Sequence, residues 1–280
     1  MTEKIEFTKM HGCGNDYIYI DCRRGVPNDI EGLARRLSRR HTGVGGDGII
    51  LVCASDRADF KMRIFNADGS EGKMCGNGIR CVAKFVYDKG FTDRKDLMID
   101  TLSGVKHVVI AEDARPGDEE IQVTVDMGLP VVESAEESVS ISEGVAYRGA
   151  CISMGNPHFV CFVDEYPGDS LVLGDGPQIE RHPRFPDRTN VEFARIAGKS
   201  EIEMRVWERG SGETMACGTG ACAVAVAAIT AGLTEKAVTV HLRGGDLRIA
   251  LNDDGHVMMT GPAATAFEGK CIIENLEFRI

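Results

Sequence analysis

The sequence predicts an α+β protein of two similar lobes, in each of which strands surround one central helix. Three observations carry this prediction. A stretch of the first half recurs in the second half at a fixed offset. The chain has 280 residues, enough for two domains of about 140 residues each. In both halves, several strand-like segments flank one long helical segment that is rich in small and apolar residues.

The repeat covers Met62–Gly90 and returns without a gap as Met204–Gly232, at an offset of 142. In both copies an apolar strand leads through a glycine-rich turn to a cysteine, then Gly-x-Gly, then a helical run. The cysteines, Cys75 and Cys217, therefore each stand where a helix begins. Unpaired N–H groups and the helix dipole favour negative charge there, so the position is expected to lower a thiol pKa and to bind a carboxylate.

Two duplicated lobes are usually related by an approximate two-fold axis, which makes equivalent residues face one another. We therefore expect Cys75 and Cys217 on opposite sides of a cleft that forms the active site. A thiolate on one side would remove a hydrogen from a carbon, and a thiol on the other side would deliver one to the opposite face. Inversion at that carbon would follow.

Hydrophobic patterning gives the other elements in order. In the first half we expect strands at Ile5–Met10, Tyr17–Asp21, Leu97–Ile110 and Ile121–Asp126, and a helix at Ile30–Arg39. The glycines of TGVGGDG match G-x-G-x-x-G, but they precede a strand instead of opening a helix, which argues against a dinucleotide site.

Leu129–Ser142 is rich in Glu and Ser and is expected to be the crossover between lobes. The second helix is apolar on every side and must therefore lie in a core. In the second half we expect strands at Gly149–Met154, His158–Val163, Ala237–Ala250 and His256–Thr260, the helix at Thr219–Ala231 and a final strand within Ala266–Ile280. The predicted lobes are residues 1–127, completed by a strand at 268–280, and residues 128–267.

Composition narrows the function. The formal net charge of −11 argues against nucleic acid or an anionic membrane as a partner. The N-terminus lacks a signal-peptide pattern, and no apolar run approaches the ~18 residues of a membrane span, so we expect a cytosolic protein. The 10 cysteines include no C-x-x-C pair, and the histidines have no ligand spacing, so neither a disulfide framework nor a metal is expected.

The repeat also extends upstream of the cysteine segments. Gly14 and Asn15 match Gly155 and Asn156 at an offset of 141. Either asparagine fits the structural role of an Asx turn. Their recurrence in both halves favours a second role, in which both face a ligand.

Six segments together resemble diaminopimelate epimerases in order and spacing from residue 7 to residue 223: FTKMHGCGNDY, HTGVGGDGIILV, IFNADGSEGKMCGNGIRC, SMGNPHFV, RTNVEFARI and WERGSGETMACGTGACA. The resemblance implies a cofactor-independent enzyme that interconverts LL- and meso-diaminopimelate on the route to lysine and peptidoglycan. It also implies that each lobe is a curved β-sheet or barrel around its helix, and that the protein is a homodimer without metal.

The resemblance assigns roles residue by residue. Cys75 would donate and Cys217 accept the hydrogen for the LL substrate, with the roles exchanged in reverse. Backbone at Gly76, Asn77, Gly218 and Thr219 would hold the reacting carboxylate. The other implied substrate contacts are Asn15, Asn66, Asn156, Asn190, Glu208 and Arg209, and His158 and Glu208 would tune the cysteines. Some members carry Gln where this chain has Gly48, so that contact is not transferred.

The charges of the expected substrate support part of this assignment, but three alternative functions stay open. A substrate with two carboxylates and two ammonium groups needs a cation and an anion for its second centre, which Arg209 and Glu208 supply. A proline or hydroxyproline racemase would need no such pair, and usually has His where Asn77 stands. A thiol redox or metal-binding protein predicts a disulfide or a bound ion. A catalytically silent amino-acid-binding protein would bind without exchanging hydrogen.

Overall fold

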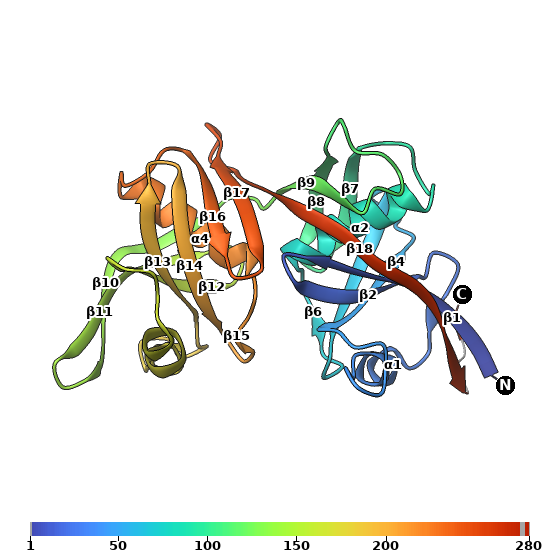
Figure 1. Cartoon of the computed structure of the whole chain (residues 1–280), viewed down its shortest axis with the longest axis horizontal. Helices are drawn as coiled ribbons and strands as arrows, with labels where there is room; N and C mark the ends of the chain where they lie inside the picture. Colours follow the sequence, from blue (N-terminus) through green and yellow to red (C-terminus); the bar gives the residue numbers. More distant parts are fainter. Residues whose placement is uncertain (1, 275–277, 280) are drawn as a thin grey trace. The chain divides into compact units, whose positions relative to one another are not determined.

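The computed structural model describes residues 2–274 and 278–279, and the chain divides into two compact units (Figure 1). The first unit comprises Met1–Val125 and Gly261–Ile280, and the second comprises Asp126–Thr260. Each unit contains many strands and one long helix, so the predicted α+β class with two lobes is confirmed.

The first unit is a ring of strands around a helix. Its elements are β1 (Thr2–Gly12), β2 (Asn15–Asp21), β3 (Val26–Pro27), α1 (Ile30–Leu37), β4 (Gly48–Cys53), β5 (Phe60–Asn66), β6 (Glu71–Gly72), α2 (Gly76–Asp88), β7 (Asp96–Thr101), β8 (Gly104–Ile110), β9 (Glu120–Asp126), the later part of β18 (Val257–Glu274) and β19 (Phe278–Arg279). Hydrogen-bonded neighbours follow the order β1, β2, β4, β5, β7, β8, β9 and β18, and β18 pairs again with β1. The sheet is thereby closed.

The strand β4 shows why the sheet wraps around α2. All its residues are buried, because its two faces are covered by different helices. Ile49 and Leu51 pack in one core cluster with Leu33 and Leu37 of α1. Ile50 points the other way, close to Gly78 at the start of α2. A continuous apolar strand of this kind is expected where both faces of a sheet are buried.

The second unit repeats this plan. Its elements are β10 (Val131–Ser142), β11 (Val145–Ser153), β12 (Pro157–Phe162), the π-helix η1 (Ser170–Asp175), α3 (Gly176–Glu180), β13 (Asn190–Gly198), β14 (Glu201–Glu208), β15 (Gly212–Glu213), α4 (Gly218–Thr230), β16 (Ala237–Leu242), β17 (Gly245–Leu251) and the first residues of β18. The parallel pairs β12–β13 and β14–β16 correspond to β2–β4 and β5–β7. Adding 142 to the bounds of α2 gives the bounds of α4.

Three features differ from the sequence-based expectations. The segment expected as a crossover forms β10, an exposed strand paired with β11, whose few apolar residues include the fully buried Val139. The short helices η1 and α3 were not predicted, since Ser170–Glu180 has no strong apolar period. Residues 261–267 belong to the first unit and not to the second lobe, because β18 pairs with β1 from Ala264 onward.

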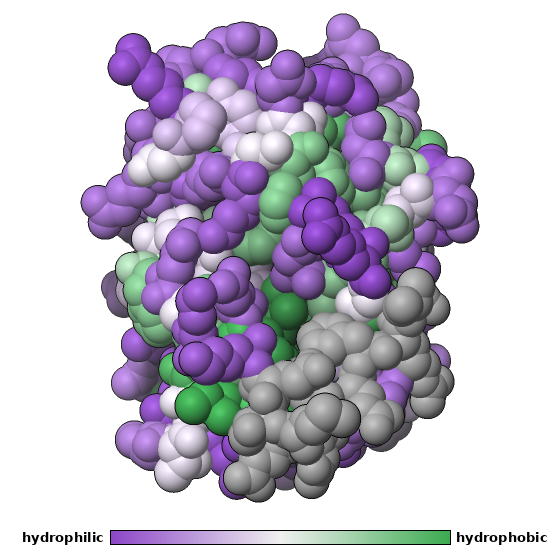
Figure 2. Space-filling view, turned by 90° about the vertical axis from the view of Figure 1, so that its right-hand side faces the viewer, coloured by the Kyte–Doolittle hydropathy of each residue, from purple (hydrophilic) through white to green (hydrophobic). Residues whose placement is uncertain are grey.

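The face of the first unit seen in Figure 2 is mostly hydrophilic, with apolar residues gathered in a smaller central band. Among the described residues, the helices are too short or too polar to cross a bilayer.

A substitution at Gly48 tests how closely β4 packs against β5. A Cβ added to Gly48 would lie 2.1 Å from the backbone oxygen of Phe65, so Gly48→Ala should force the two strands apart. We expect the free energy of unfolding to fall by about 2 kcal/mol or more, as in other overpacked sites. Gly168→Ala is the control, because nothing lies within 4 Å of its added Cβ. Equal urea midpoints for the two variants would contradict this account.

Candidate active site

Each predicted cysteine is the N-cap of its long helix. Cys75 and Cys217 have extended backbone conformations, with φ −136° and −115°, immediately before α2 and α4. Their sulfur atoms accept the backbone N–H of Gly78 at 3.3 Å and of Gly220 at 3.4 Å. Serine or aspartate oxygen usually makes this capping bond. The bond fixes each sulfur at the positive end of a helix.

Around Cys75, amide side chains form the hydrogen-bonding environment. The thiol donates to Oδ1 of Asn15 at 3.3 Å, and Nδ2 of Asn77 lies 3.5 Å from the same oxygen. Arg80 is fully buried and donates from Nη2 to Oδ1 of Asn77 at 3.0 Å. The buried guanidinium therefore sets the orientation of the Asn77 amide, whose nitrogen end faces Asn15.

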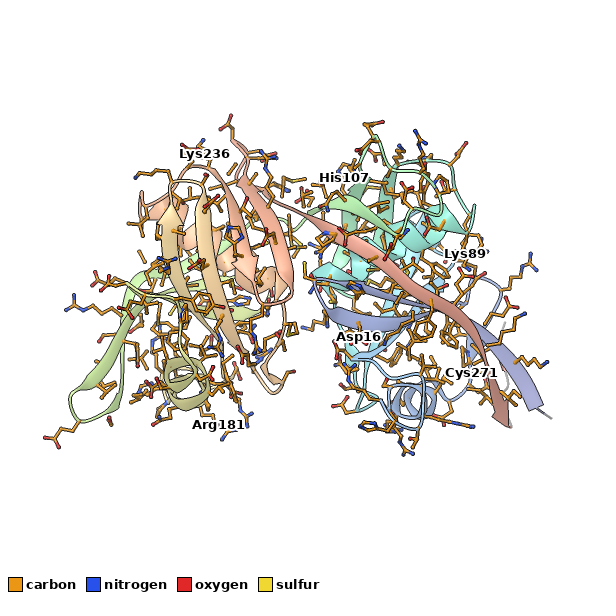
Figure 3. The ribbon with its side chains drawn as sticks, viewed as in Figure 1. Asp16, Lys89, His107, Arg181, Lys236 and Cys271 are labelled. Carbon is orange, nitrogen blue, oxygen red and sulfur yellow. The ribbon has the colours of Figure 1, made fainter. Side chains whose placement is uncertain are left out.

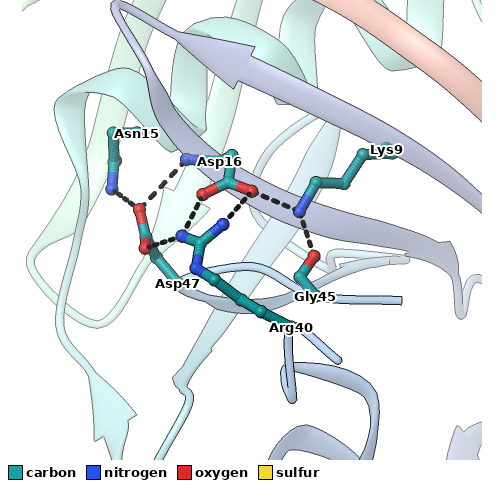
Figure 4. Close-up of polar contacts among 6 residues, drawn as sticks. All are labelled: Lys9, Asn15, Asp16, Arg40, Gly45 and Asp47. Atoms are coloured by element: carbon teal, nitrogen blue, oxygen red, sulfur yellow. Dashed lines mark hydrogen bonds and ion pairs between the residues drawn. The ribbon is translucent and has the colours of Figure 1, made fainter. Parts of the chain in front are cut away.

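A charged network holds Asn15 from its other side (Figure 4). Oδ2 of Asp47 accepts from Nδ2 of Asn15 at 2.8 Å and from the backbone N–H of Asp16 at 3.1 Å. Nη2 of Arg40 bridges Asp16 at 2.8 Å and Asp47 at 2.9 Å. Lys9 pairs with Asp16, which lies at the start of β2 (Figure 3), and donates to the Gly45 carbonyl. Because Asp47 engages the amide nitrogen, the amide oxygen of Asn15 is left for the thiol.

Asn66 stands apart from this group. It ends β5, and its Nδ2 donates to Oγ of Ser70 at 3.0 Å within a turn. Its cross-strand partner is Gly48, where the Phe65 carbonyl leaves no room for a side chain. The missing glutamine contact noted in the sequence thus has a packing reason.

The side chains around Cys217 differ from the amides around Cys75, because they include a hydroxyl group and a carboxylate. Oγ1 of Thr219 lies 3.5 Å from the sulfur and accepts from Nδ2 of Asn156 at 3.3 Å. Glu208 is partly buried, and its Oε1 accepts a hydrogen bond from Oγ1 of Thr214. Burial raises the pKa of Glu208 above its usual value, although interactions with Thr214 and Cys217 oppose the shift.

His158 lies beside this group. Its Nδ1 is 2.6 Å from Oε1 of Glu192 and 3.5 Å from Nδ2 of Asn190. Oδ1 of Asn190 accepts the backbone N–H of Arg209 at 2.8 Å, which fixes the loop that carries this exposed guanidinium. The Arg209 side chain donates from Nη1 to the Asp187 carbonyl at 2.9 Å.

The pKa of Cys217 does not follow the helix-start expectation. Burial, then the negative charges of Glu208 and Glu192, raise it well above the ordinary value of a thiol. Hydrogen bonds from Thr219 and the Gly220 N–H lower it by less. Loss of solvation and two nearby carboxylates therefore outweigh the helix terminus.

The structure brings most predicted residues into two groups, one in each unit. Asn15, Cys75, Gly76 and Asn77 lie together in the first. The second group is linked through hydrogen bonds and chain neighbours, and it contains Asn156, His158, Asn190, Glu208, Arg209, Cys217, Gly218 and Thr219.

The sequence analysis did not single out Asp47, Glu192 or Thr214. A charged residue within an otherwise apolar strand was the available signal for Glu192.

None of the 10 cysteines, all of which lie within the described residues, forms a disulfide, and those outside the two groups are buried except for the half-buried Cys271. Within the described part of the chain, no set of three or more His, Cys, Asp or Glu residues is arranged to hold a metal ion.

Comparison with known proteins identifies the family. The family model described as diaminopimelate epimerase matches residues 7–133 and 150–266. The chain belongs to the diaminopimelate epimerase family. It is therefore an isomerase. The diaminopimelate epimerase of Bacteroides thetaiotaomicron is 51% identical over 271 residues, which cover 96% of this chain and 99% of that protein. That of Methanococcus maripaludis is 47% identical over 281 residues, covering 95% and 99%.

Solved structures share the fold at low sequence identity. A hydroxyproline epimerase from Agrobacterium vitis has a TM-score of 0.73 and 16% identity, covering 97% of this chain and 93% of that one. A PhzF-family phenazine biosynthesis protein from Bacillus anthracis has a TM-score of 0.70 and 15% identity, covering 97% and 100%. These likenesses extend the two-lobe α+β architecture beyond the diaminopimelate epimerase family.

The orientation of Asn15 predicts an effect of Asp47 on thiol reactivity. Asp47→Ala releases the Asn15 amide, and Cys75 then loses an acceptor that favours its neutral form. We expect iodoacetamide to alkylate Cys75 about fivefold faster at pH 7, equivalent to roughly 1 kcal/mol for one hydrogen bond. Peptide mass spectrometry measures the rate. Asp21→Ala, which removes a carboxylate paired with Arg23 in the same unit, is the control. An unchanged rate in Asp47→Ala would contradict the proposed orientation.

The lowered pKa of Asp16 predicts that the protein loses stability in acid. Burial favours a higher pKa for Asp16, but hydrogen bonds from Arg40 and Lys9 outweigh it and hold the pKa below the ordinary 3.8. A carboxyl group with a lowered folded-state pKa contributes stability above its unfolded pKa, and this contribution is lost as the pH falls through the folded value. We expect the free energy of unfolding to drop below about pH 4. Asp16→Asn should flatten this drop in urea titrations; an identical pH profile would refute the assignment.

Proposed function

We propose that this protein converts LL-2,6-diaminopimelate to meso-diaminopimelate, without a cofactor, through a thiol and a thiolate. Cys217 removes the α-hydrogen of the LL substrate, and Cys75 delivers a hydrogen to the opposite face of the same carbon. The reverse reaction exchanges these roles. The observation that carries the proposal is the paired capping geometry, in which two equivalent helices each begin at a cysteine whose sulfur accepts a backbone N–H.

The environments of the two sulfurs suit opposite roles. Cys75 donates its proton in a hydrogen bond to the amide of Asn15, an arrangement that stabilises the neutral thiol. Cys217 lies near the carboxylates of Glu208 and Glu192, whose negative charges act on the thiol, and a carboxylate can hold a proton. A proton donor and a proton acceptor are both needed for inversion at one carbon.

Substrate binding would rest on the helix starts, on four asparagine side chains and on Arg209. The backbone at Gly76, Asn77, Gly218 and Thr219 would bind the carboxylate of the reacting centre, since helix N-termini attract anions. Asn15 and Asn156 would contact this centre, whereas Asn66, Asn190 and Arg209 would read the distal amino acid centre. Exposed Arg209 can offer a bidentate guanidinium to the second carboxylate.

Two roles are expected for Glu208, and its contacts favour one of them. The sequence assigned it both to the distal ammonium group and to tuning of the cysteines. Its carboxylate accepts a hydrogen bond from Thr214, and its negative charge raises the pKa of Cys217, which supports the tuning role.

The difficult step is removal of a weakly acidic α-hydrogen without a pyridoxal electron sink. The helix termini at the carboxylate and the exclusion of water around buried Cys217 would supply the necessary electrostatic stabilisation.

The protein would act in the cytoplasm, in the biosynthesis of lysine and peptidoglycan precursors. It would act there as a homodimer.

Hydrogen exchange tests the reaction. We expect the protein, incubated with LL-diaminopimelate in deuterated water without added cofactor, to replace the α-hydrogen by deuterium and to form the meso isomer. Mass spectrometry and chiral chromatography measure both events. Binding without exchange would identify a silent binding protein and refute the proposal.

Cysteine variants test the two-base mechanism. Cys75→Ala and Cys217→Ala should each lower the epimerisation rate by at least about 1000-fold, because each removes one of the two proton-transferring groups. Cys271→Ala is the matched control, since Cys271 is a half-buried cysteine of β18 outside both groups. Substantial epimerisation by either single variant would exclude a mechanism that needs both thiols.

A further inference from the structure

The tip of the β14–β15 hairpin carries Arg209, and polar contacts fix this tip more than packing does. Residues 209–211 connect the two strands, and both Arg209 and Gly210 are exposed. A Cβ added to Gly210 would meet nothing within 4 Å among the described residues, and its φ of +81° lies in the left-handed region that glycine adopts readily. An exposed tip of this kind keeps one position only where hydrogen bonds hold its backbone.

A buried carboxylate accepts one of these hydrogen bonds. Glu180, the last residue of α3, is only 2% exposed. Its Oε1 accepts the backbone N–H of Gly210 at 3.1 Å, and its Oε2 accepts Nε1–H of Trp207 at 2.9 Å. Nε of the exposed Arg181 lies 3.9 Å from Oε2. One buried side chain therefore contacts the hairpin on both sides of Arg209 in the chain.

The same carboxylate reaches the segment that supports the Arg209 guanidinium. Nη1 of Arg188 lies 3.5 Å from Oε1 of Glu180. Arg188 has a φ of +58°, a left-handed conformation that is uncommon outside glycine, and this conformation sets the direction of the preceding peptide. The carbonyl of that peptide belongs to Asp187, and it accepts a hydrogen bond from Nη1 of Arg209 at 2.9 Å. Glu180 thus contacts both the backbone that carries the guanidinium and the segment that supports it.

The equivalent β5–β6 hairpin of the first unit lacks these groups. At the offset of 142, the first unit has Ser38, Phe65 and Ala67 where the second has Glu180, Trp207 and Arg209. Phe65 has no N–H to donate, and the Arg35 guanidinium instead donates to the Asp68 carbonyl of that tip at 3.1 Å. The buried carboxylate and its indole donor therefore occur in the copy whose tip carries a cation.

We propose that Glu180 is a positioning residue that holds Arg209 in place to bind the second carboxylate of the substrate. This inference rests on the proposed function, which assigns Arg209 to the distal amino acid centre. Asn190 accepts the N–H of Arg209 and Glu180 accepts the next N–H along the chain, so two successive peptide groups fix the base of the side chain. Ordering a long exposed side chain costs entropy on binding, and a fixed backbone lowers that cost.

The contact made by Glu180 also leaves the Arg209 guanidinium available to a ligand. The hydrogen bond goes to the backbone of the tip, so it does not occupy the side chain of Arg209. A carboxylate that bound the guanidinium directly would compete with the substrate. A carboxylate that binds the adjacent peptide instead positions the cation without neutralising it in an ion pair.

A substitution that keeps the shape of Glu180 tests this role. In Glu180→Gln, the amide nitrogen must face either the Gly210 N–H or the Trp207 indole N–H, so one of the two hydrogen bonds is lost. We expect KM for LL-diaminopimelate to rise about tenfold, as for loss of one hydrogen bond to a charged group, with kcat within about twofold of the wild type. Glu203→Gln is the matched control, because it neutralises a glutamate of β14 that pairs with Arg195, and both constants should stay unchanged.

A double-substitution cycle separates positioning from a general loss of structure. Arg209→Ala removes the group that Glu180 positions, so adding Glu180→Gln to it should change KM by less than about twofold. A purely structural role would raise KM by the same factor in both backgrounds. That result, an unchanged KM in Glu180→Gln, or a fall in kcat at constant KM would each overturn the proposal.

Two provisions keep the test decisive. If circular dichroism shows that Glu180→Gln does not fold, Glu180→Asp replaces it in the same cycle, since the shorter carboxylate cannot reach both donors. If the wild type shows no epimerisation, the proposed function fails, and the cycle is repeated on the Kd for diaminopimelate measured by calorimetry. The same tenfold loss and the same coupling to Arg209 would then support the positioning role, and a Kd that Glu180→Gln leaves unchanged would overturn it.

Discussion

The hydrogen bond from a backbone N–H to a cysteine sulfur at the start of each long helix is the interaction on which the rest depends. Sulfur replaces the usual capping oxygen, and Gly78 and Gly220 supply the N–H donors. Because the bond ties a reactive atom to the start of a buried helix, the packing of that helix sets the position of the sulfur. A site built on helix starts and strand ends is held more tightly than one built on flexible loops.

The scaffold has been conserved between the two units, whereas the polar groups around the sulfurs have diverged. The strand pairings and the bounds of α2 and α4 coincide at the repeat offset. Amide groups and the buried Arg80 surround Cys75, but carboxylates and an imidazole surround Cys217. A two-base reaction needs this difference, since one sulfur must hold a proton while the other receives one.

Burial has a cost that the packing of each unit must offset. Asn190, His158 and Glu192 are almost wholly removed from solvent and are connected to one another by hydrogen bonds. Such networks specify one arrangement strongly because partial satisfaction is expensive. In the first unit, Asp47 and Arg40 fix the Asn15 amide in the same way, but from a more exposed position.

The sequence by itself determined the class of fold, the position of both long helices and the place of both cysteines, because these follow from local periodicity and an internal repeat. It also predicted Asn15 and Asn156 as ligand-facing residues from the recurring Gly-Asn pair, and Glu208 from the family resemblance. Only the tertiary structure decided that Val131–Ser142 is a strand, since its pairing with β11 depends on a distant segment. The raised pKa of Cys217 and the contacts of Asp47 and Glu192 likewise follow from the tertiary structure, because burial and charge proximity arise only when strands far apart in sequence meet.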